Sequence, residues 1–154
     1  MKAKRVVLTF VMLFVGLTTC FAANPNLGTW KLNEAKSKIA PGAPKNVTVT
    51  YEAAGDSIKG TIDGVDGEGK PTHNEWTGKF DGKDYPVTGD SSSDMRALKQ
   101  IDDHHYDLTV KKSGKVTMTG KAVVSADGKT RTVTISGTDP SGKKMTSTAV
   151  YDKQ

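Results

Sequence analysis

The stretch Gly28-Thr29-Trp30-Lys31-Leu32 is the part of this sequence that decides the fold. A glycine two residues before a tryptophan on a first strand lets the strand bend, while the indole plugs one end of a closing sheet. The chain finishes with a second run of strand-forming residues, Thr146-Ser147-Thr148-Ala149-Val150-Tyr151. The two ends together predict a small β-barrel with one plugged end.

Between these ends, short alternating runs rich in Val, Thr, Ile and Tyr are each followed by a turn that contains glycine. This pattern is typical of an antiparallel meander, and it predicts about ten strands. Closing such a sheet hides both of its edges, so the predicted fold is an all-β, single up-and-down barrel. The expected strands are 27–32, 47–52, 58–62, 76–80, 85–87, 95–101, 106–111, 116–124, 130–136 and 145–151.

Several connections have recognisable turn chemistry. Asp81-Gly82 predicts a tight hairpin, and Asp139-Pro140-Ser141-Gly142 predicts the turn into the last strand. The segment 33–46 is broken by prolines, so we expect either a loop or one short helix that Asn33 caps. The segments 63–71 and 89–94, rich in glycine and in serine respectively, are expected to be mobile surface loops.

The first residues have the form of a secretory signal, with three basic residues ahead of the apolar run 6–17. Small residues favour cleavage between Ala22 and Ala23. We therefore expect a signal peptide at 1–22, one barrel domain at 23–154, and a secreted or periplasmic protein. Nothing later in the chain is apolar over the ~20 residues that a spanning helix needs.

The stretch Leu17-Thr18-Thr19-Cys20 resembles a bacterial lipoprotein box, in which Cys20 would be lipidated and would anchor the protein to a membrane. Thr19 departs from the Gly, Ala or Ser that normally precedes the cysteine. An ordinary cleaved signal, which would discard Cys20, is the interpretation that we prefer.

The charge pattern argues against a nucleic-acid partner. The formal charge is +5, and residues 1–22 hold three of the 22 basic residues and none of the 17 acidic ones, so the rest of the chain carries only +2. The remaining lysines alternate with Asp and Thr and form no basic cluster.

The chain is expected to be a monomer.

The chain resembles the lipocalin and fatty-acid-binding protein (calycin) superfamily, and in particular small secreted lipocalin-like proteins of bacteria. The Gly28-x-Trp30 opening is shared by the whole superfamily. Likeness to the fatty-acid-binding branch comes from residues 28–32, from Gly55-Asp56 between the second and third strands, and from the closing run 146–151. The resemblance implies a barrel that carries a small hydrophobic or amphipathic molecule.

Two departures from the fatty-acid-binding branch bear on the ligand. That branch has a helical lid after its first strand, where this chain has only the proline-broken segment 33–46. It also has an arginine two residues before the last-strand tyrosine, and here Tyr151 is retained while the arginine position is Ala149. Outside the expected signal, Arg96 and Arg131 are the only arginines available as replacements.

Candidate site residues follow from this barrel. Trp76 is either a cavity wall or a surface aromatic, and the Tyr151 hydroxyl either orients a ligand or bonds a neighbouring strand. Arg131 or Arg96 could cover the face of the Trp30 indole. The expected ligand-binding residues are Tyr51, Trp76, Met118, Tyr151 and Arg96, and the expected structural plug is Gly28, Trp30 and Arg131.

No metal, cofactor or catalytic site is expected. Asp102-Asp103-His104-His105 is the cluster closest to chemistry, but adjacent strand residues point to opposite faces, so a solvated hairpin end is preferred to a metal site. Asp63, Asp66 and Glu68 do not have the spacing of a calcium loop, and His73 is isolated. No nucleophile elbow or phosphate loop is present, so an enzyme is not expected.

Three hypotheses about function remain. The first is an exported barrel that binds or carries a small, partly hydrophobic ligand of a lipid-like class. The second is a structural or interaction protein of the cell envelope without a ligand cavity. The third is an enzyme built on the barrel, because barrels host unrelated chemistries.

Overall fold

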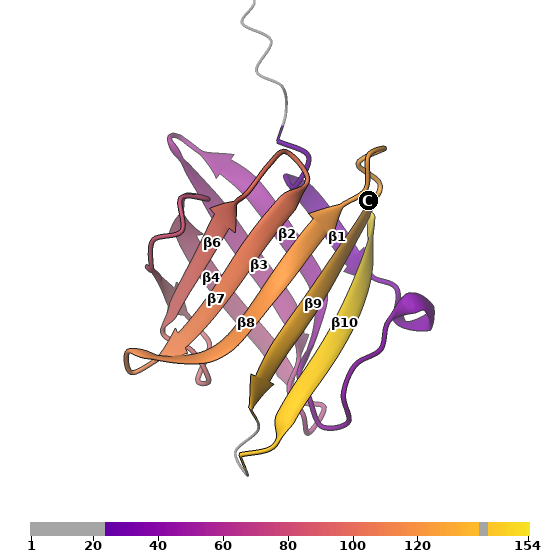
Figure 1. Cartoon of the computed structure of the whole chain (residues 1–154), viewed down its shortest axis with the longest axis vertical. Coiled ribbons are helices and arrows are strands. Elements are labelled where there is room, and N and C mark those ends of the chain that lie inside the picture. Colours follow the sequence, from indigo (N-terminus) through magenta and orange to yellow (C-terminus); the bar gives the residue numbers. More distant parts are fainter. Residues whose placement is uncertain (1–23, 139–141) are drawn as a thin grey trace, which may run out of the picture.

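The computed structural model describes residues 24–138 and 142–154. Ten antiparallel strands follow one another and close into a barrel, because β1 pairs with both β2 and β10 (Figure 1). The all-β, up-and-down barrel that the sequence predicted is thus confirmed. The elements are β1 (Gly28–Leu32), η1 (Glu34–Lys36), β2 (Lys45–Ala54), β3 (Ser57–Val65), β4 (Pro71–Gly78), β5 (Tyr85–Thr88), β6 (Met95–Gln100), β7 (His105–Lys112), β8 (Lys115–Val124), β9 (Thr130–Thr138) and β10 (Lys144–Lys153).

Some predictions concern residues outside these ranges. The expected signal at 1–22, Cys20 within it, and residues 139–141 of the expected last turn lie outside the described residues. Across the described ranges, no helix has the length and apolar character needed to span a membrane.

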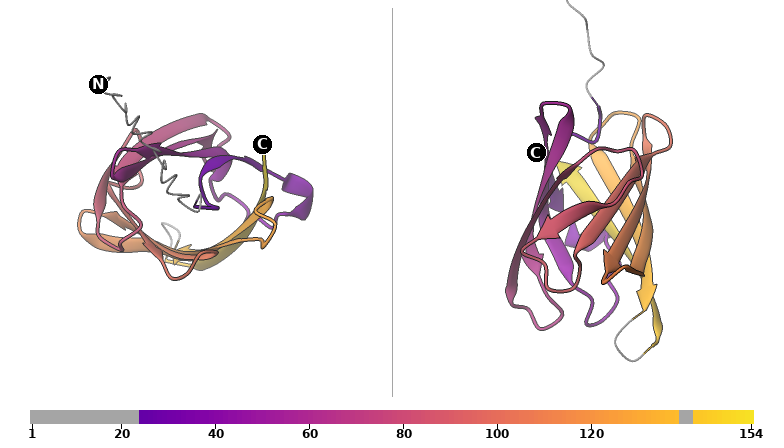
Figure 2. Two further views of the ribbon diagram at one scale, coloured as in Figure 1. Left: turned by 90° about the horizontal axis from the view of Figure 1, so that it is seen from above. Right: turned by 90° about the vertical axis from the view of Figure 1, so that its left-hand side faces the viewer.

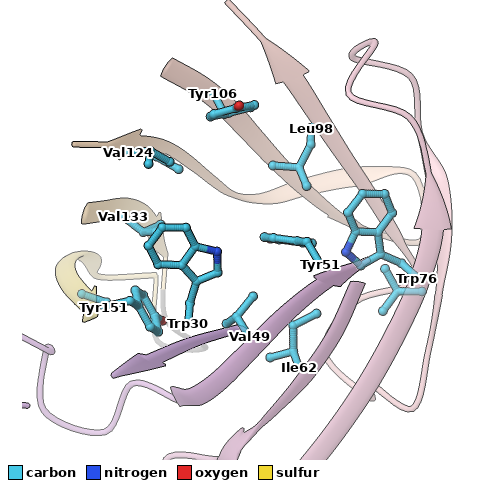
Figure 3. Close-up of a cluster of buried hydrophobic side chains, with 13 residues drawn as sticks. Trp30, Val49, Tyr51, Ile62, Trp76, Leu98, Tyr106, Val124, Val133 and Tyr151 are labelled. Carbon is cyan, nitrogen blue, oxygen red and sulfur yellow. The ribbon is translucent and has the colours of Figure 1, made fainter. Parts of the chain in front are cut away.

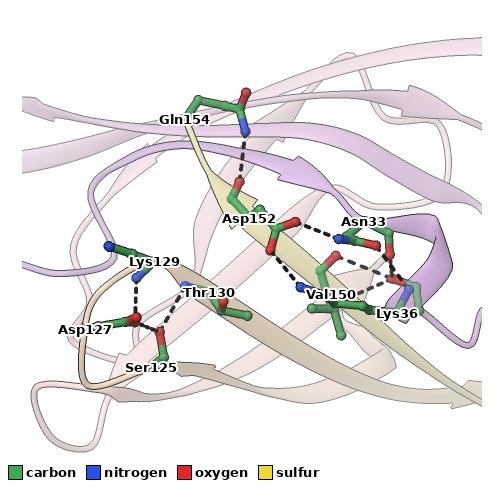
Figure 4. A network of polar contacts seen from close by, with 10 residues as sticks. Asn33, Lys36, Ser125, Asp127, Lys129, Thr130, Val150, Asp152 and Gln154 are labelled. Atoms are coloured by element: carbon green, nitrogen blue, oxygen red, sulfur yellow. Dashed lines mark hydrogen bonds and ion pairs between the residues drawn. The ribbon is translucent and has the colours of Figure 1, made fainter.

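The short helix η1 follows β1 directly, as the sequence allowed. The side chain of Asn33 accepts a hydrogen bond from the N–H of Lys36, which is the predicted N-cap. The same side chain donates to Asp152 Oδ2 at 2.7 Å, so the helix is tied to the end of β10 (Figure 4). Lys36 adds an ion pair with Asp152 at 3.6 Å.

The expected tight hairpin at Asp81-Gly82 is wrong. β4 ends at Gly78 and β5 begins at Tyr85, so the connection is longer than two residues. Its middle lies against β6 instead, where the N–H of Gly82 donates to the carbonyl of Leu98. Local turn chemistry identified a turn there, but pairing with a third strand determined its shape.

The core lies inside the barrel and consists of one residue in two from each strand, as strand alternation requires (Figure 3). Aromatic side chains dominate it, and they meet edge to face at centroid distances such as 6.0 Å for Tyr51 and Phe80 and 5.3 Å for Phe80 and Tyr106. The buried members are Trp30, Val49, Tyr51, Ile62, Trp76, Val87, Leu98, Tyr106, Ala122, Val124, Val133, Ala149 and Tyr151.

One end of the barrel is closed by the segment that precedes β1. Seen from above, the start of the described chain lies inside the ring of strands (Figure 2, left). Trp30 is fully buried, and its indole N–H donates to the carbonyl of Asn26 at 2.9 Å. The Tyr106 hydroxyl donates to Asn24 Oδ1 at 2.8 Å on the far wall. Trp30 and the segment 24–27 therefore form the closed end together.

The cation over the Trp30 indole is Lys153, 4.9 Å from the ring centroid, and the predicted Arg131 or Arg96 is wrong. Lys153 lies directly opposite Trp30 in the β1–β10 register, whereas Arg131 lies one strand further away, opposite Tyr151. Gly28 makes this contact possible, because its φ is +114° and a Cβ there would lie 2.9 Å from Lys153 Cε.

Candidate functional site

We call the interior of the barrel the lumen. Its inward-facing side chains are more deeply buried near the closed end than in the next row along the strands. One cross-strand row on β7, β8, β9 and β10 is fully buried, with Tyr106, Ala122, Val133 and Ala149. The next inward-facing row, away from the closed end, keeps partial solvent access at every position. Its members are Leu108, Gly120, Ile135 and Ser147. On these four strands the inward-facing side chains are therefore less buried in this row, although Leu98 and Val110 nearby are 1% and 3% exposed.

Two of the predicted ligand-binding residues pack against each other across a glycine. Tyr51, Gly60 and Trp76 lie opposite one another on β2, β3 and β4. A Cβ atom at Gly60 would overlap the Trp76 indole, so the glycine leaves the space in which Tyr51 and Trp76 meet at 6.2 Å. Trp76 is 2% exposed, so it is an interior residue rather than a surface aromatic.

Arg131 is buried in the lumen without an acidic partner. It is 4% exposed, and its guanidinium carbon lies 5.2 Å from the Tyr51 ring centroid and 5.9 Å from that of Tyr151. Its Nη2 donates to the Tyr51 hydroxyl at 3.3 Å, while its Nε has no hydrogen-bond partner. Within the described ranges no carboxylate forms an ion pair with it. Two aromatic faces and one hydroxyl compensate only part of the cost of burying a charge.

Arg96 brings a second guanidinium into the same space. Its side chain is 12% exposed, Nη1 donates to Asn74 Oδ1 at 3.2 Å, and Nη2 lies 3.9 Å from Asp90 Oδ2. Burial lowers the pKa of the Arg96 guanidinium; the charge of Arg131 acts in the same direction, and Tyr51 and Asp90 oppose it. The positive charge of Arg131 therefore acts against the charged form of Arg96.

The Tyr151 side chain is buried next to Arg131. Tyr151 is 3% exposed and lies beside Arg131 in the β9–β10 register, and burial raises the pKa of this tyrosine to about 12. In the part of the chain that the structure describes, its hydroxyl forms no hydrogen bond. The alternative in which a neighbouring strand satisfies this hydroxyl is therefore not what the structure shows.

Most of the predicted site is brought together. Tyr51 and Tyr151 both lie against Arg131, which belongs to this group rather than over Trp30, while Arg96 is coupled to Tyr51 and Arg131 through charge alone. Met118 lies apart from them, opposite Val110 and over Gly137.

The sequence interpretation missed Asn74 and Asp90, which hold the Arg96 guanidinium. Once β4 is placed, strand alternation puts the polar Asn74 at an inward-facing position, and this pattern could have identified it. In the structure Asn74 is 7% exposed. Asp90 gave no such signal, because it lies in the loop 89–94, which we expected to be a mobile surface loop. Ser93 of that loop is only 1% exposed, so the loop folds partly into the barrel mouth.

A separate hollow of about 220 Å³ lies on the outer surface of β7 and β8. His105 belongs to it, and the ring Nδ1 lies 2.8 Å from Asp102 Oδ1. The N–H groups of His104 and His105 also donate to this carboxylate, and these hydrogen bonds lower the pKa of Asp102. The acid–histidine cluster is an exposed loop end rather than part of the lumen.

The other acidic candidates also lie outside the lumen. The prediction that His73 is isolated is wrong, because its Nδ1 lies 2.6 Å from Asp63 Oδ1 on the neighbouring strand. Asp66 Oδ1 accepts from the N–H groups of Glu68 and Lys70, which closes a turn. Among residues 24–138 and 142–154, no group of three or more potential ligand side chains could hold a metal ion.

Comparison with known proteins adds no functional assignment: no protein-family model matches this sequence, and no curated protein is similar to it. The site must therefore be interpreted from its own chemistry.

Proposed function

We propose that this barrel binds a small amphipathic molecule with an anionic head group. The head group contacts Arg131, Arg96 and the Tyr151 hydroxyl. The apolar part lies along the accessible inward-facing row and its neighbour, against Leu108, Ile135 and Met118. The observation that carries the proposal is the buried guanidinium of Arg131, which has no acidic partner in the described residues.

The physical argument concerns the charge of Arg131. A guanidinium removed from water loses its hydration, and this loss is recovered only when hydrogen bonds and an opposite charge replace the water. Arg131 has one hydrogen bond and two aromatic faces, and its Nε is unpartnered. A bound carboxylate or sulfonate would supply the missing acceptor and the missing charge.

In this proposal the partly exposed row of the lumen supplies the apolar surface for the rest of the ligand. Leu108 and Ile135 face inward and pack against the core, yet both keep partial solvent access. An apolar chain that replaced water on these surfaces would gain about 25 cal/mol for each Å² removed from water. An amphipathic ligand therefore matches both halves of the site.

The biological role that we propose is carriage or sequestration of this ligand, with no catalytic step. The signal expected at 1–22 supports a location outside the cytoplasm, secreted or periplasmic. Membership of the calycin superfamily is part of the same proposal, supported by the Gly28-x-Trp30 opening and the closed barrel.

The experiment is a fluorescence titration with anilinonaphthalene sulfonate, an anionic amphipathic probe, and with phenylnaphthylamine, its uncharged analogue. We expect saturable binding with a preference for the anionic probe. Arg131→Met should weaken sulfonate binding at least about tenfold, because a hydrogen bond to a charged group contributes about 1.5–3 kcal/mol. Binding of the uncharged probe should change much less.

Lys121→Met is the matched control, since it removes one positive charge from the outer face of the barrel. Its sulfonate affinity should equal that of the wild type. If the wild-type protein binds neither probe, and its organic extract contains no small molecule, the proposed function is wrong.

A further inference from the structure

The loop between β5 and β6 directs an acidic side chain into the barrel mouth. The Asp90 side chain is 19% exposed. Its Oδ1 accepts hydrogen bonds from the N–H and the hydroxyl of Ser92 at 2.8 and 2.6 Å, and its Oδ2 accepts one from the Ser93 hydroxyl at 2.6 Å. Three donors on its own loop therefore fix the position of this carboxylate.

Asp90 is ionised at neutral pH. Burial acts to raise the pKa of its carboxyl group, but the hydrogen bonds from Ser92 and Ser93 and the charge of Arg96 outweigh burial and lower the pKa below its ordinary value. Arg96 therefore has a negative charge beside it at neutral pH.

The contact between Asp90 and Arg96 is an ion pair without a direct hydrogen bond. Its N–O distance is 3.9 Å, whereas a charge-assisted hydrogen bond between these groups is about 2.7–2.9 Å long. Asp90 thus neutralises Arg96 electrostatically and leaves its Nη2 free to donate. Arg131 has no such counter-charge within the described residues.

We propose that Asp90 determines which head groups the site accepts: it leaves one uncompensated positive charge, so the site favours a singly charged anion over a doubly charged one. This inference rests on the proposed function. A monoanion that contacts both Arg131 and Arg96 balances the three charges, whereas a second negative charge on it would lie near the Asp90 carboxylate, which is 3.9 Å from Arg96 Nη2. Like charges brought together in a partly buried site repel each other, and this repulsion selects against the dianion.

The test compares two probes with the same alkyl chain, dodecanesulfonate and dodecyl phosphate, by calorimetric titration below their micelle concentrations. At about pH 8 the phosphate is doubly charged, because its second pKa is about 6. The wild-type protein should prefer the sulfonate. Asp90→Asn should strengthen phosphate binding relative to sulfonate binding by about tenfold or more, the equivalent of about 1.4 kcal/mol.

Asp94→Asn is the matched control, because it removes one negative charge from the same loop. Its Oδ2 accepts from the N–H of Ser113, in the turn between β7 and β8, and does not pair with Arg96. This variant should keep the wild-type preference. An equal change in Asp94→Asn would show that only the net charge of the protein matters, which overturns the inference.

A second pair of variants tests the charge balance without relying on Asp90→Asn alone. Arg96→Gln leaves Asp90 without its partner and should weaken sulfonate binding. Adding Asp90→Asn to Arg96→Gln returns the cluster to one positive charge and should recover part of the sulfonate binding, but not the contact that Arg96 itself makes. Failure of this rescue, or an unchanged probe preference in Asp90→Asn, overturns the inference while the proposed function stands. A wild-type protein that binds neither probe overturns both.

Discussion

Single residues decide how side chains share the inside of this barrel. Gly60 lies between Tyr51 and Trp76 on adjacent strands, and its missing side chain is the space that the indole occupies. Gly28 plays the corresponding part for Lys153, whose stem passes over it to reach Trp30. In both places a glycine permits a close approach between a larger side chain and the backbone.

Gly60→Ala should therefore destabilise the protein and displace Trp76. Overpacking of a core by one methyl group costs about 1–3 kcal/mol, so we expect a loss of that size in the free energy of unfolding in urea. Tryptophan emission should shift to the red. Thr61→Ala, on the neighbouring outward-facing position, is the control. Unchanged emission and stability in Gly60→Ala would contradict this account of the Tyr51–Trp76 contact.

At the scale of elements, the segment 24–27 before β1 has no regular structure but forms hydrogen bonds with side chains of three strands. Asn24, Pro25 and Asn26 bond to side chains of β7, β10 and β1 respectively. These bonds link strands that are far apart in the sequence and cover the closed end of the barrel. The segment is short, but its partners lie on the adjacent strands β1 and β10 and on the distant strand β7.

The bond between Asn24 and Tyr106 should be measurable in a double-mutant cycle. Asn24→Ala and Tyr106→Phe should each lower the free energy of unfolding, and their coupling energy should be about 0.5–1.5 kcal/mol, the usual net contribution of one hydrogen bond. Strictly additive effects of the two substitutions would show that the hydroxyl and the amide do not interact in solution.

At the scale of the whole molecule, two buried tyrosines link stability to alkaline pH. Burial raises the pKa of Tyr106 and of Tyr151 to about 12, from an ordinary value of 10.0. Between these values the unfolded chain loses protons that the folded chain keeps. Stability from this source is therefore complete below pH 10 and is lost as the pH rises through about 12.

Urea denaturation at increasing pH should show this loss as a fall in the free energy of unfolding above pH 10. Tyr151→Phe, which removes one of the two ionisable hydroxyls, should show a smaller fall. Tyrosinate absorbance measured in parallel should appear with the unfolding transition. An identical pH dependence in wild type and Tyr151→Phe would show that other groups cause the loss.

The sequence was enough to predict the barrel, because alternation and turn residues are local signals that survive in any register. It also offered Asn33 as the cap of a short helix, which the structure confirms, but it left open whether Trp76 lies in the interior or on the surface. It misplaced the hairpin at Asp81-Gly82, because a pairing with β6 shapes that connection.

By itself, then, the sequence determined the fold: an all-β chain whose Gly28-x-Trp30 opening and closing run meet in one barrel. Only the tertiary structure decided which charges lie inside it. Lys153 covers Trp30, Arg131 lies against Tyr51 and Tyr151, and Arg96 pairs with Asp90. The physical reason is register, because the pairing of distant strands determines which side chains become neighbours, and no local pattern encodes that choice.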